Sequence, residues 1–243
     1  VRIELENVPS GTLKFYDADN REVPFEIESL NKDGTSVIWV KVPELPANGA
    51  AFLWVYYGGE GTGTEESEVW NRDYQLVEHF AEGKSAGDTL ADSTGKQTGT
   101  VSGAGYTTSA GENGDYGAAF AGTKIQFGNV GGGYDQISLS AIVSMTQDDL
   151  DKMDDFGAII SKQLSGESTG NAFLLGVSDS AQVMANLYTL WQESNDKQEN
   201  EVTSEETLDA GEPHLLTVSY DGITLVVFID GVIVYEKLVE CGT

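Results

Sequence analysis

The sequence is poor in the residues that build disulfides and tight metal sites. Its 243 residues include one cysteine, Cys241, and two histidines. A single cysteine excludes an intrachain disulfide. One cysteine and two histidines do not supply the four ligands of a structural zinc site. We therefore expect no disulfide framework and no metal-binding cluster of histidine and cysteine.

Basic residues are also scarce. The chain has 13 Lys and Arg against 40 Asp and Glu, a formal net charge of -27. Such a surface repels phosphate backbones and anionic lipid heads, which argues against nucleic acid and membrane surfaces as partners. Cations and uncharged ligands such as neutral glycans fit this charge better. Alternatively, the acidity serves only to keep a secreted or salt-adapted protein soluble.

Long apolar runs are missing as well. No stretch of about 20 apolar residues is present, so the sequence predicts no membrane-spanning helix. No signal peptide is recognisable at the start. The chain begins at Val1 within an expected strand. We therefore expect a fragment of a longer protein, whose flanks carry any targeting signal or anchor.

What is present is a succession of strand patterns. Residues 1–60 alternate apolar and polar positions or form short runs of β-branched and aromatic residues. Trp39 and Trp54 lie in two of these runs and are expected in the core. A Gly-rich, acidic stretch at 61–69 is typical of a linker. The expected strands of the first unit span 2–6, 12–16, 23–29, 37–42 and 51–57.

The clearest local signal is near the end. Asp221-Gly222 and Asp230-Gly231 separate three runs rich in β-branched residues, at 214–220, 223–229 and 232–237. Asp-Gly favours tight type I′ hairpin turns, because these turns need a positive φ at both of their central residues. The only helical pattern is a short turn at 146–155, where Thr146 is a candidate cap. These patterns together predict an all-β chain.

The first 60 residues resemble a small β domain of unknown function found in bacterial and archaeal envelope proteins. The resemblance lies in Leu13-Lys14-Phe15-Tyr16-Asp17-Ala18-Asp19, in the strands at 23–28 and 37–43, and in Trp54-Val55-Tyr56-Tyr57-Gly58-Gly59. It implies a small N-terminal β domain at 1–60, with an extra strand normally preceding Val1.

Residues 70–243 resemble laminin-G-like domains of the concanavalin A-like lectin and glucanase superfamily. The resemblance is carried by segments at 70–80, 92–96, 117–122 and 157–162, and most specifically by His214 to Gly231. It implies a two-sheet antiparallel sandwich of jelly-roll type that stops before its last strand. The same domain order is familiar from bacterial surface proteins, and from envelope proteins that carry a Tol/Ton-type proton channel. It therefore implies an extracytoplasmic location.

Because glucanases share this sandwich, an enzyme has to be considered. Their carboxylates come from one strand, in the pattern Glu-X-Asp-X-X-Glu, which does not occur here. The nearest string, Glu26-Ile27-Glu28, is interpreted as the polar face of a strand. Neither a Ser-His-Asp triad nor a phosphate-cradling glycine motif is recognisable. His214 is interpreted as structural, so we expect no catalytic residue and regard a glycoside hydrolase as the least favoured function.

The resemblance to laminin-G-like sandwiches, which often hold Ca²⁺ with Asp side chains and loop carbonyls, implies calcium as a structural ion rather than a required cofactor. Hard oxygen ligands suit Ca²⁺. A solvated acidic surface explains the same residues without a metal, so no metal ligand is assigned. The candidates are Asp88, Asp92 and Asp135 in Gly-rich loops, and the cluster Asp148, Asp149, Asp151, Asp154 and Asp155.

Tyr188 and Trp191 are the candidate ligand-binding residues, because exposed aromatic rings stack on sugar faces. Alternatively, both rings are core or loop-anchoring residues. The sequence thus predicts a non-catalytic extracytoplasmic binding or adhesion module, with a neutral glycan or a surface protein as partner. The alternative is a structural spacer or sensory ectodomain of a larger envelope protein.

Overall fold

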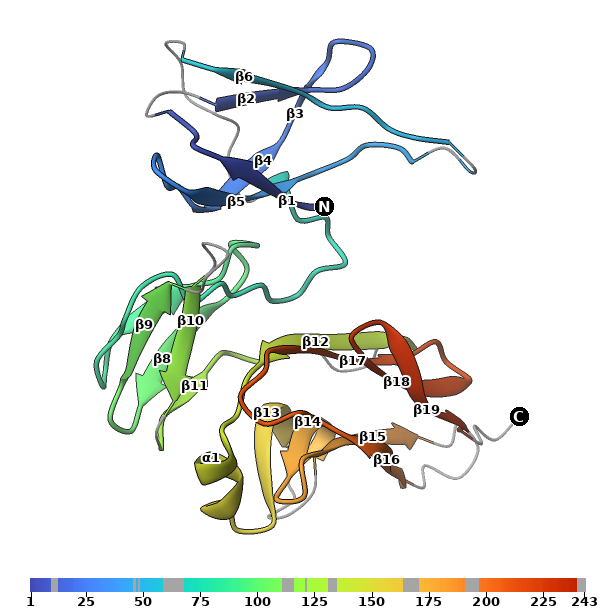
Figure 1. Ribbon diagram of the computed structural model, residues 1–243. Coiled ribbons are helices and arrows are strands. Elements are labelled where there is room, and N and C mark those ends of the chain that lie inside the picture. The colour runs from blue at the N-terminus through green and yellow to red at the C-terminus, as the bar shows by residue number, and fades with distance from the viewer. Residues whose placement is uncertain are drawn as a thin grey trace. The chain divides into compact units, whose positions relative to one another are not determined.

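The computed structural model confirms an all-β chain (Figure 1). It describes residues 1–9, 13–45, 47, 49–58, 68–110, 116–120, 122–130, 135–163, 171–190 and 197–239. The chain divides into two compact units, Val1–Val130 and Gly131–Thr243. In the described residues, no helix is long and apolar enough to cross a membrane.

The first unit begins with two three-stranded antiparallel sheets. One has the order β1-β5-β4 and the other the order β3-β2-β6. Phe15 and Ile38 come from different sheets and lie fully buried in one shared core. The two sheets therefore form a small sandwich, where the sequence predicts strands without specifying how they pack. Its strands are β1 (Arg2–Glu6), β2 (Leu13–Tyr16), β3 (Glu22–Val23), β4 (Phe25–Ser29), β5 (Thr35–Val40) and β6 (Trp54–Tyr57).

The described residues in the rest of the first unit contain five more strands. They form a three-stranded sheet, β11-β8-β7, and a two-stranded one, β10-β9. Leu90, Val101 and Tyr106 make a separate small core there. The strands are β7 (Thr89–Ala91), β8 (Thr98–Ser102), β9 (Tyr106–Ala110), β10 (Tyr116–Phe120) and β11 (Lys124–Gln126).

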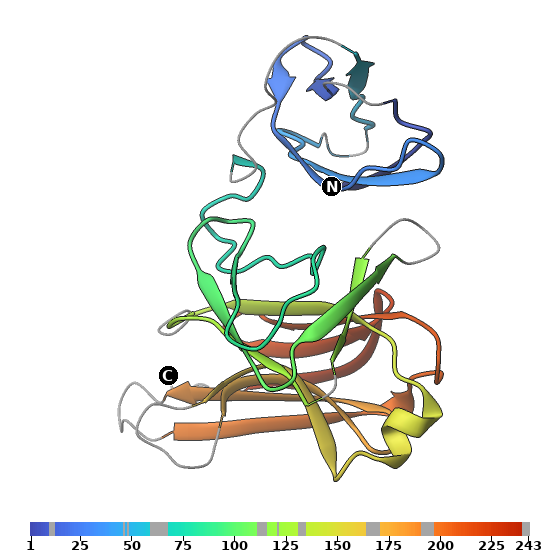
Figure 2. The ribbon, with the colours of Figure 1, turned by 90° about the vertical axis from the view of Figure 1, so that its left-hand side faces the viewer.

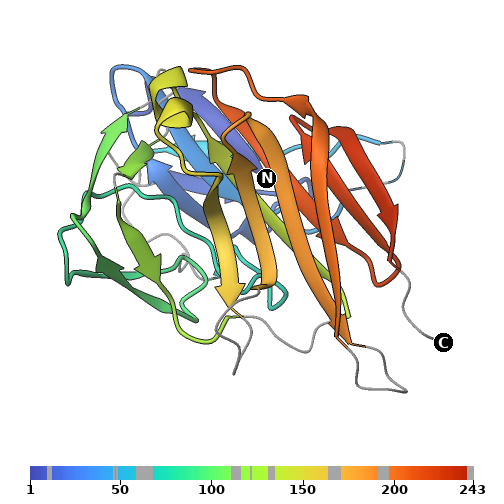
Figure 3. The same cartoon turned by 90° about the horizontal axis from the view of Figure 1, so that it is seen from below.

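The second unit is a sandwich of two four-stranded antiparallel sheets, with the orders β12-β17-β18-β19 and β13-β14-β15-β16. Figure 2 shows the two layers edge-on, and in Figure 3 the orange strands of the second sheet lie side by side. The strands are β12 (Ile137–Val143), β13 (Phe156–Gln163), β14 (Asn171–Ser178), β15 (Gln182–Leu190), β16 (Lys197–Thr207), β17 (His214–Tyr220), β18 (Thr224–Ile229) and β19 (Val232–Leu238).

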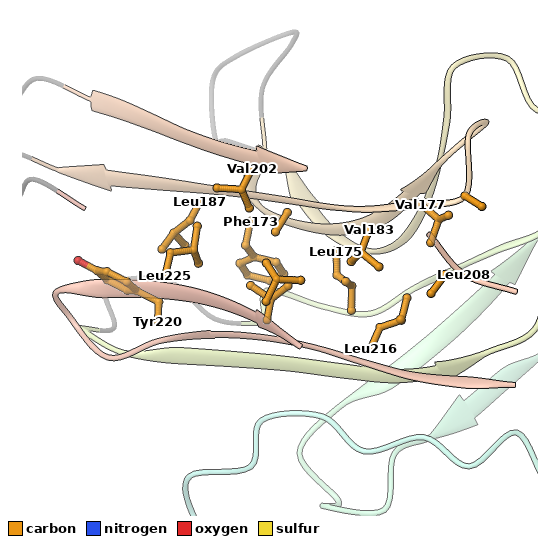
Figure 4. Close-up of a cluster of buried hydrophobic side chains, with 14 of the residues drawn as sticks. Phe173, Leu175, Val177, Val183, Leu187, Val202, Leu208, Leu216, Tyr220 and Leu225 are labelled. Carbon is orange, nitrogen blue, oxygen red and sulfur yellow. The ribbon is translucent and has the colours of Figure 1, made fainter. Parts of the chain in front are cut away.

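Alternate residues of facing strands fill the space between these layers (Figure 4). Leu175 and Val183 point inward from one sheet, and Leu216 and Leu225 from the other; all four are fully buried. Burying a side chain of this size stabilises a fold by about 1.5–3 kcal/mol. The period of two in these strands therefore fixes which face of each sheet is internal.

Both predicted hairpins are present, since β17 pairs with β18 and β18 with β19, but only the second has the predicted tight turn. Asp230 and Gly231 both have positive φ, 52° and 78°, and Ile229 pairs directly with Val232. At the first turn only Gly222 has a positive φ, and β18 starts at Thr224. The Asp221 side chain accepts hydrogen bonds from the backbone N–H groups of Ile223 and Thr224. The turn is therefore longer than the two-residue turn that the sequence predicts.

The predicted helical turn is also present. Helix α1 (Gln147–Asp151) begins after Thr146, whose side chain accepts from the N–H of Asp149 while the Asp149 carboxylate accepts from the N–H of Thr146. This reciprocal pair satisfies donors that the first turn of a helix leaves free.

Candidate functional site

The outer face of the sheet β3-β2-β6 carries a row of exposed aromatic side chains. Leu53 and Val55 pack against the first core. The alternation of β6 therefore turns Trp54 and Tyr56 to the solvent side, and Phe52, two residues before the strand, is exposed as well. Their exposed fractions are 68%, 60% and 54%. Large aromatic side chains this open cost free energy in water, which marks the row as a surface for contact.

A fourth ring completes this surface. Tyr16 lies directly opposite Trp54 in the register of β2 and β6, and its ring centroid is 5.4 Å from that of Tyr56, edge to face. Beside it, Lys14 Nζ is 3.2 Å from Glu22 Oε2, so the two adjacent charges cancel. We call Tyr16, Phe52, Trp54 and Tyr56 the aromatic strip.

The sequence prediction that Trp54 is a core residue is wrong. Residues 51–57 form a continuous apolar run, so its period of two is hidden. Trp39, also expected in the core, is half-buried instead, on the face of β5 opposite to the buried Ile38 and Val40.

Trp39 belongs to a second cluster, on the outer face of the sheet β1-β5-β4. Glu26 and Glu28 project from β4, and Trp70 and His79 reach them from the segment that follows the first sandwich. We call Glu26, Glu28, Trp39, Trp70 and His79 the clasp. Because Trp70 lies 44 positions after its partner Glu26, the clasp fastens residues 70–79 to this sheet.

Hydrogen bonds and ion pairs hold the clasp. Trp39 Nε1 donates to Glu28 Oε2 at 2.7 Å, and Trp70 Nε1 donates to Glu26 Oε2 at 2.5 Å. His79 lies between the carboxylates, with Nδ1 3.4 Å from Glu28 Oε2 and Nε2 3.5 Å from Glu26 Oε2. The exposed side-chain fractions are 12% for His79, 5% for Glu26 and 7% for Glu28. This is a nearly dry ion-pair network.

The electrostatics of the clasp favour a charged imidazole. Each ring nitrogen of His79 faces a carboxylate, and only the imidazolium carries N–H groups at both nitrogens. Burial by itself lowers the pKa of His79, but the nearby glutamates outweigh it and the net pKa is raised. Burial likewise raises the pKa of Glu26, but the ion pair with His79 and hydrogen bonds from Ser93 and Trp70 leave it lowered.

Aromatic rings pack around these charges. The ring centroids of Trp39 and Trp70 are 5.2 Å apart, and Tyr74 meets Trp70 edge-on at 5.0 Å. Glu26 and Glu28 do project from the outer face of the strand, as interpreted from the sequence. That face is not open to solvent, however, since Glu26 is buried. Nothing in the local pattern indicates the cover supplied by residues so distant in sequence.

The predicted ligand residues are only partly visible. Tyr188 lies in β15, half-buried, in register with Glu199, and Glu199 accepts a hydrogen bond from Asn186 at 2.6 Å. Trp191 lies outside the described residues. The binding role of this pair stays a prediction.

The structural role predicted for His214 is confirmed. Its Nε2 accepts from the N–H of Asp209 at 3.1 Å, which leaves Nδ1 to donate to Asp230 Oδ2 at 2.7 Å. Both ring nitrogens are thus engaged, and the ring fastens the start of β17 to the turn before β19.

The calcium candidates are spread over several roles. The Asp92 carboxylate is buried and accepts backbone N–H groups from Thr94 and Gln97, so it stabilises a turn. Asp149 caps α1, and Asp148 pairs with Lys152. Within the described residues, no three His, Cys, Asp or Glu side chains form a metal-binding group. Calcium binding stays a prediction.

Comparison with known families gives one match. Residues 10–88 match the family model described as Domain of unknown function (DUF2341), which supports an N-terminal domain of unknown function. No curated protein and no solved structure matches the chain. The matched stretch runs through the predicted linker at 61–69 and includes Trp70 and His79, so it covers both the aromatic strip and the clasp. The domain boundaries expected from the sequence stay predictions.

Proposed function

We propose that this chain is a non-catalytic extracytoplasmic binding module for neutral carbohydrate, and that the aromatic strip is its binding surface. The observation that carries the proposal is the row Phe52, Trp54 and Tyr56, each more than half exposed on one sheet face. Aromatic rings offer large, rigid contact area at low entropic cost, and Tyr adds a hydroxyl for hydrogen bonding.

Charge supports a neutral ligand. Lys14 and Glu22 beside the strip neutralise each other, while the whole chain carries a net charge of -27. The global field repels acidic polymers, and the strip itself offers no excess cation to hold them. Sugar hydroxyls, in contrast, can accept from Lys14 and donate to Glu22.

The clasp supports a binding role over catalysis. A retaining glycosidase needs two carboxylates about 5–5.5 Å apart that both reach the substrate. Glu26 and Glu28 each accept an indole N–H and are covered by residues 70–79. Their exposed side-chain fractions of 5% and 7% leave no room for a sugar between them.

A second function is favoured by the clasp itself: a structural spacer or sensory ectodomain of a larger envelope protein. A dry ion-pair network that fastens one segment to the preceding sandwich stiffens the chain at that point. The extracytoplasmic location in both proposals draws its support from the resemblance to envelope proteins. The laminin-G-like reading of residues 70–243 is part of the same proposal, and the antiparallel two-sheet arrangement of the second unit is compatible with it.

A glycan array probed with and without Ca²⁺ tests the proposal. We expect binding to neutral glycans and none to sialylated or uronate-rich ones. Trp54→Ala should then weaken binding by about 1–3 kcal/mol, the cost of truncating an aromatic anchor. Tyr57→Ala is the matched control, because this exposed neighbour pairs with the inward-facing Leu13 and lies on the other face of β6. Equal affinities of the two variants, or no glycan bound at all, would refute the proposal and leave the spacer function.

A further inference from the structure

Three members of the aromatic strip follow one another along β6 and the residues just before it. Phe52, Trp54 and Tyr56 occupy alternate positions, and a step of two residues in a strand spans about 6.8 Å. Trp54 and Tyr56, both in β6, are therefore about 6.8 Å apart along the strand, and Phe52 lies two residues before β6 begins. Since β6 has one hydrogen-bonded neighbour, β2, in the described part of its sheet, the row lies at a sheet edge. A ligand that touches all three rings has to be elongated and to lie parallel to β6.

The rings of the strip are also open to solvent, since Phe52, Trp54 and Tyr56 are each more than half exposed. The cavity found in this unit, of about 280 Å³, lies beside β3, and its described lining is Asp17, Arg21, Glu22, Val23, Pro24, Lys41 and Pro43. The aromatic rings do not belong to that lining. A single sugar or a chain end needs a concave site that buries most of its surface. On an open row, each sugar gains one stacking face, so useful affinity has to come from several sugars held at once.

We propose that the strip binds the side of a linear, unbranched, neutral polysaccharide, with successive sugars stacked on Phe52, Trp54 and Tyr56. This inference rests on the proposed carbohydrate-binding function and names its ligand class. Once one sugar is stacked, the next is held at a high effective concentration over the next ring, so the contributions multiply. Tyr16 and the Lys14–Glu22 pair line one flank of the row, where they contact hydroxyls along the chain.

Isothermal titration of unbranched glucan, xylan and mannan oligosaccharides, from one to eight sugars long, tests the inference. For the preferred polymer, we expect affinity to rise at least about tenfold, 1.4 kcal/mol, between the disaccharide and the length that covers the strip. Beyond that length it should level off. In Phe52→Ala or Tyr56→Ala, which remove a ring at one end of the row, the affinity should level off at a shorter oligosaccharide. In Tyr57→Ala the affinity should rise with length as in the wild type.

The possible outcomes distinguish a failure of this inference from a failure of the proposed carbohydrate-binding function. Equal affinity for the monosaccharide and the longest chain, or end variants that weaken every length by the same factor, would show a single-sugar site and overturn the inference while carbohydrate binding stands. If no oligosaccharide of any length binds, the proposed function fails with it. An edge strand can instead pair with a strand of another protein. If the chain binds a peptide but no sugar, and Trp54→Ala abolishes that binding, the proposed function fails as well.

Discussion

Replacing His79 with leucine should release residues 70–79 from the outer face of the first sheet. In the clasp, His79 is the cationic partner of two carboxylates whose side chains are only 5% and 7% exposed. Leucine fills a similar volume but leaves Glu26 and Glu28 facing an apolar group. Removing one partner of a buried ion pair costs about 3–5 kcal/mol, because the remaining charge stays desolvated.

Hydrogen exchange followed by mass spectrometry measures this loss where it occurs. The chain has two compact units, so a single global unfolding curve would mix their transitions. Local opening is read instead from the protection of backbone amides in residues 70–79. At about tenfold per 1.4 kcal/mol, the expected loss speeds exchange there by about two to four powers of ten. Amides of the second unit serve as the internal reference.

Two comparisons decide the cause. His214→Leu removes the other histidine of the chain, which lies in the second unit, and should leave exchange at 70–79 unchanged. Adding Glu26→Gln and Glu28→Gln to His79→Leu removes the uncompensated charges and should restore part of the protection. If His79→Leu exchanges like the wild type, or if the two glutamine substitutions rescue nothing, the ion pairs do not hold the segment and the reasoning is wrong.

Two further predictions concern packing and site assignment. Gly99→Ala should lower local stability by about 1–3 kcal/mol through overpacking, because its Cβ would lie 2.7 Å from Ile125 and 2.8 Å from Phe127. Hydrogen exchange in β8 and β11 checks this against Gly117→Ala, where a Cβ meets nothing within 4 Å. Trp191→Ala should leave glycan affinity within about twofold if the strip is the site, whereas a loss of about 1–3 kcal/mol would place the site at Trp191, as the sequence alone predicts.

The sequence predicts those elements whose signals are local. The turn at Asp230-Gly231 and the cap at Thr146 depend on residues within a few positions of one another, and both are found. The strands of the first sandwich follow from their composition as well, except that the predicted strand at 23–29 divides at Pro24 into β3 and β4, which join different sheets. Local patterns of this kind fix the class and most strand positions, because backbone conformation responds to near neighbours.

The candidate site depends on information that such patterns do not carry. In residues 51–57 every side chain is apolar or aromatic, so only the pairing of β6 with β2 shows that Trp54 faces outward. Burial of Glu26 depends on Trp70, which approaches from 44 positions away. An alternating Glu-X-Glu is usually solvated, and the aromatic cover that reverses this expectation is a tertiary contact.

The strength of the clasp should pass through a maximum with pH. The pKa of His79 is raised from its ordinary 6.5, so its contribution is complete below 6.5 and is lost as pH rises through the higher folded value. The pKa of Glu26 is lowered from 4.5, so its contribution is complete above 4.5 and is lost as pH falls through the lower folded value. Glu28 faces the same imidazole, and Glu78, whose pKa is raised chiefly by burial, adds negative charge nearby.

Both contributions are complete between pH 4.5 and 6.5, and the raised pKa of Glu78 makes its own contribution fall as pH rises above 4.5. The protection of residues 70–79, corrected for the intrinsic pH dependence of exchange, should therefore be greatest toward the acidic end of that window. His79→Gln should abolish the decline on the alkaline side, because the group that titrates there is gone, while His214→Gln should retain it. An alkaline decline that persists unchanged in His79→Gln would mean that another group controls the segment, and the imidazolium would then have no part in holding residues 70–79 to the sheet.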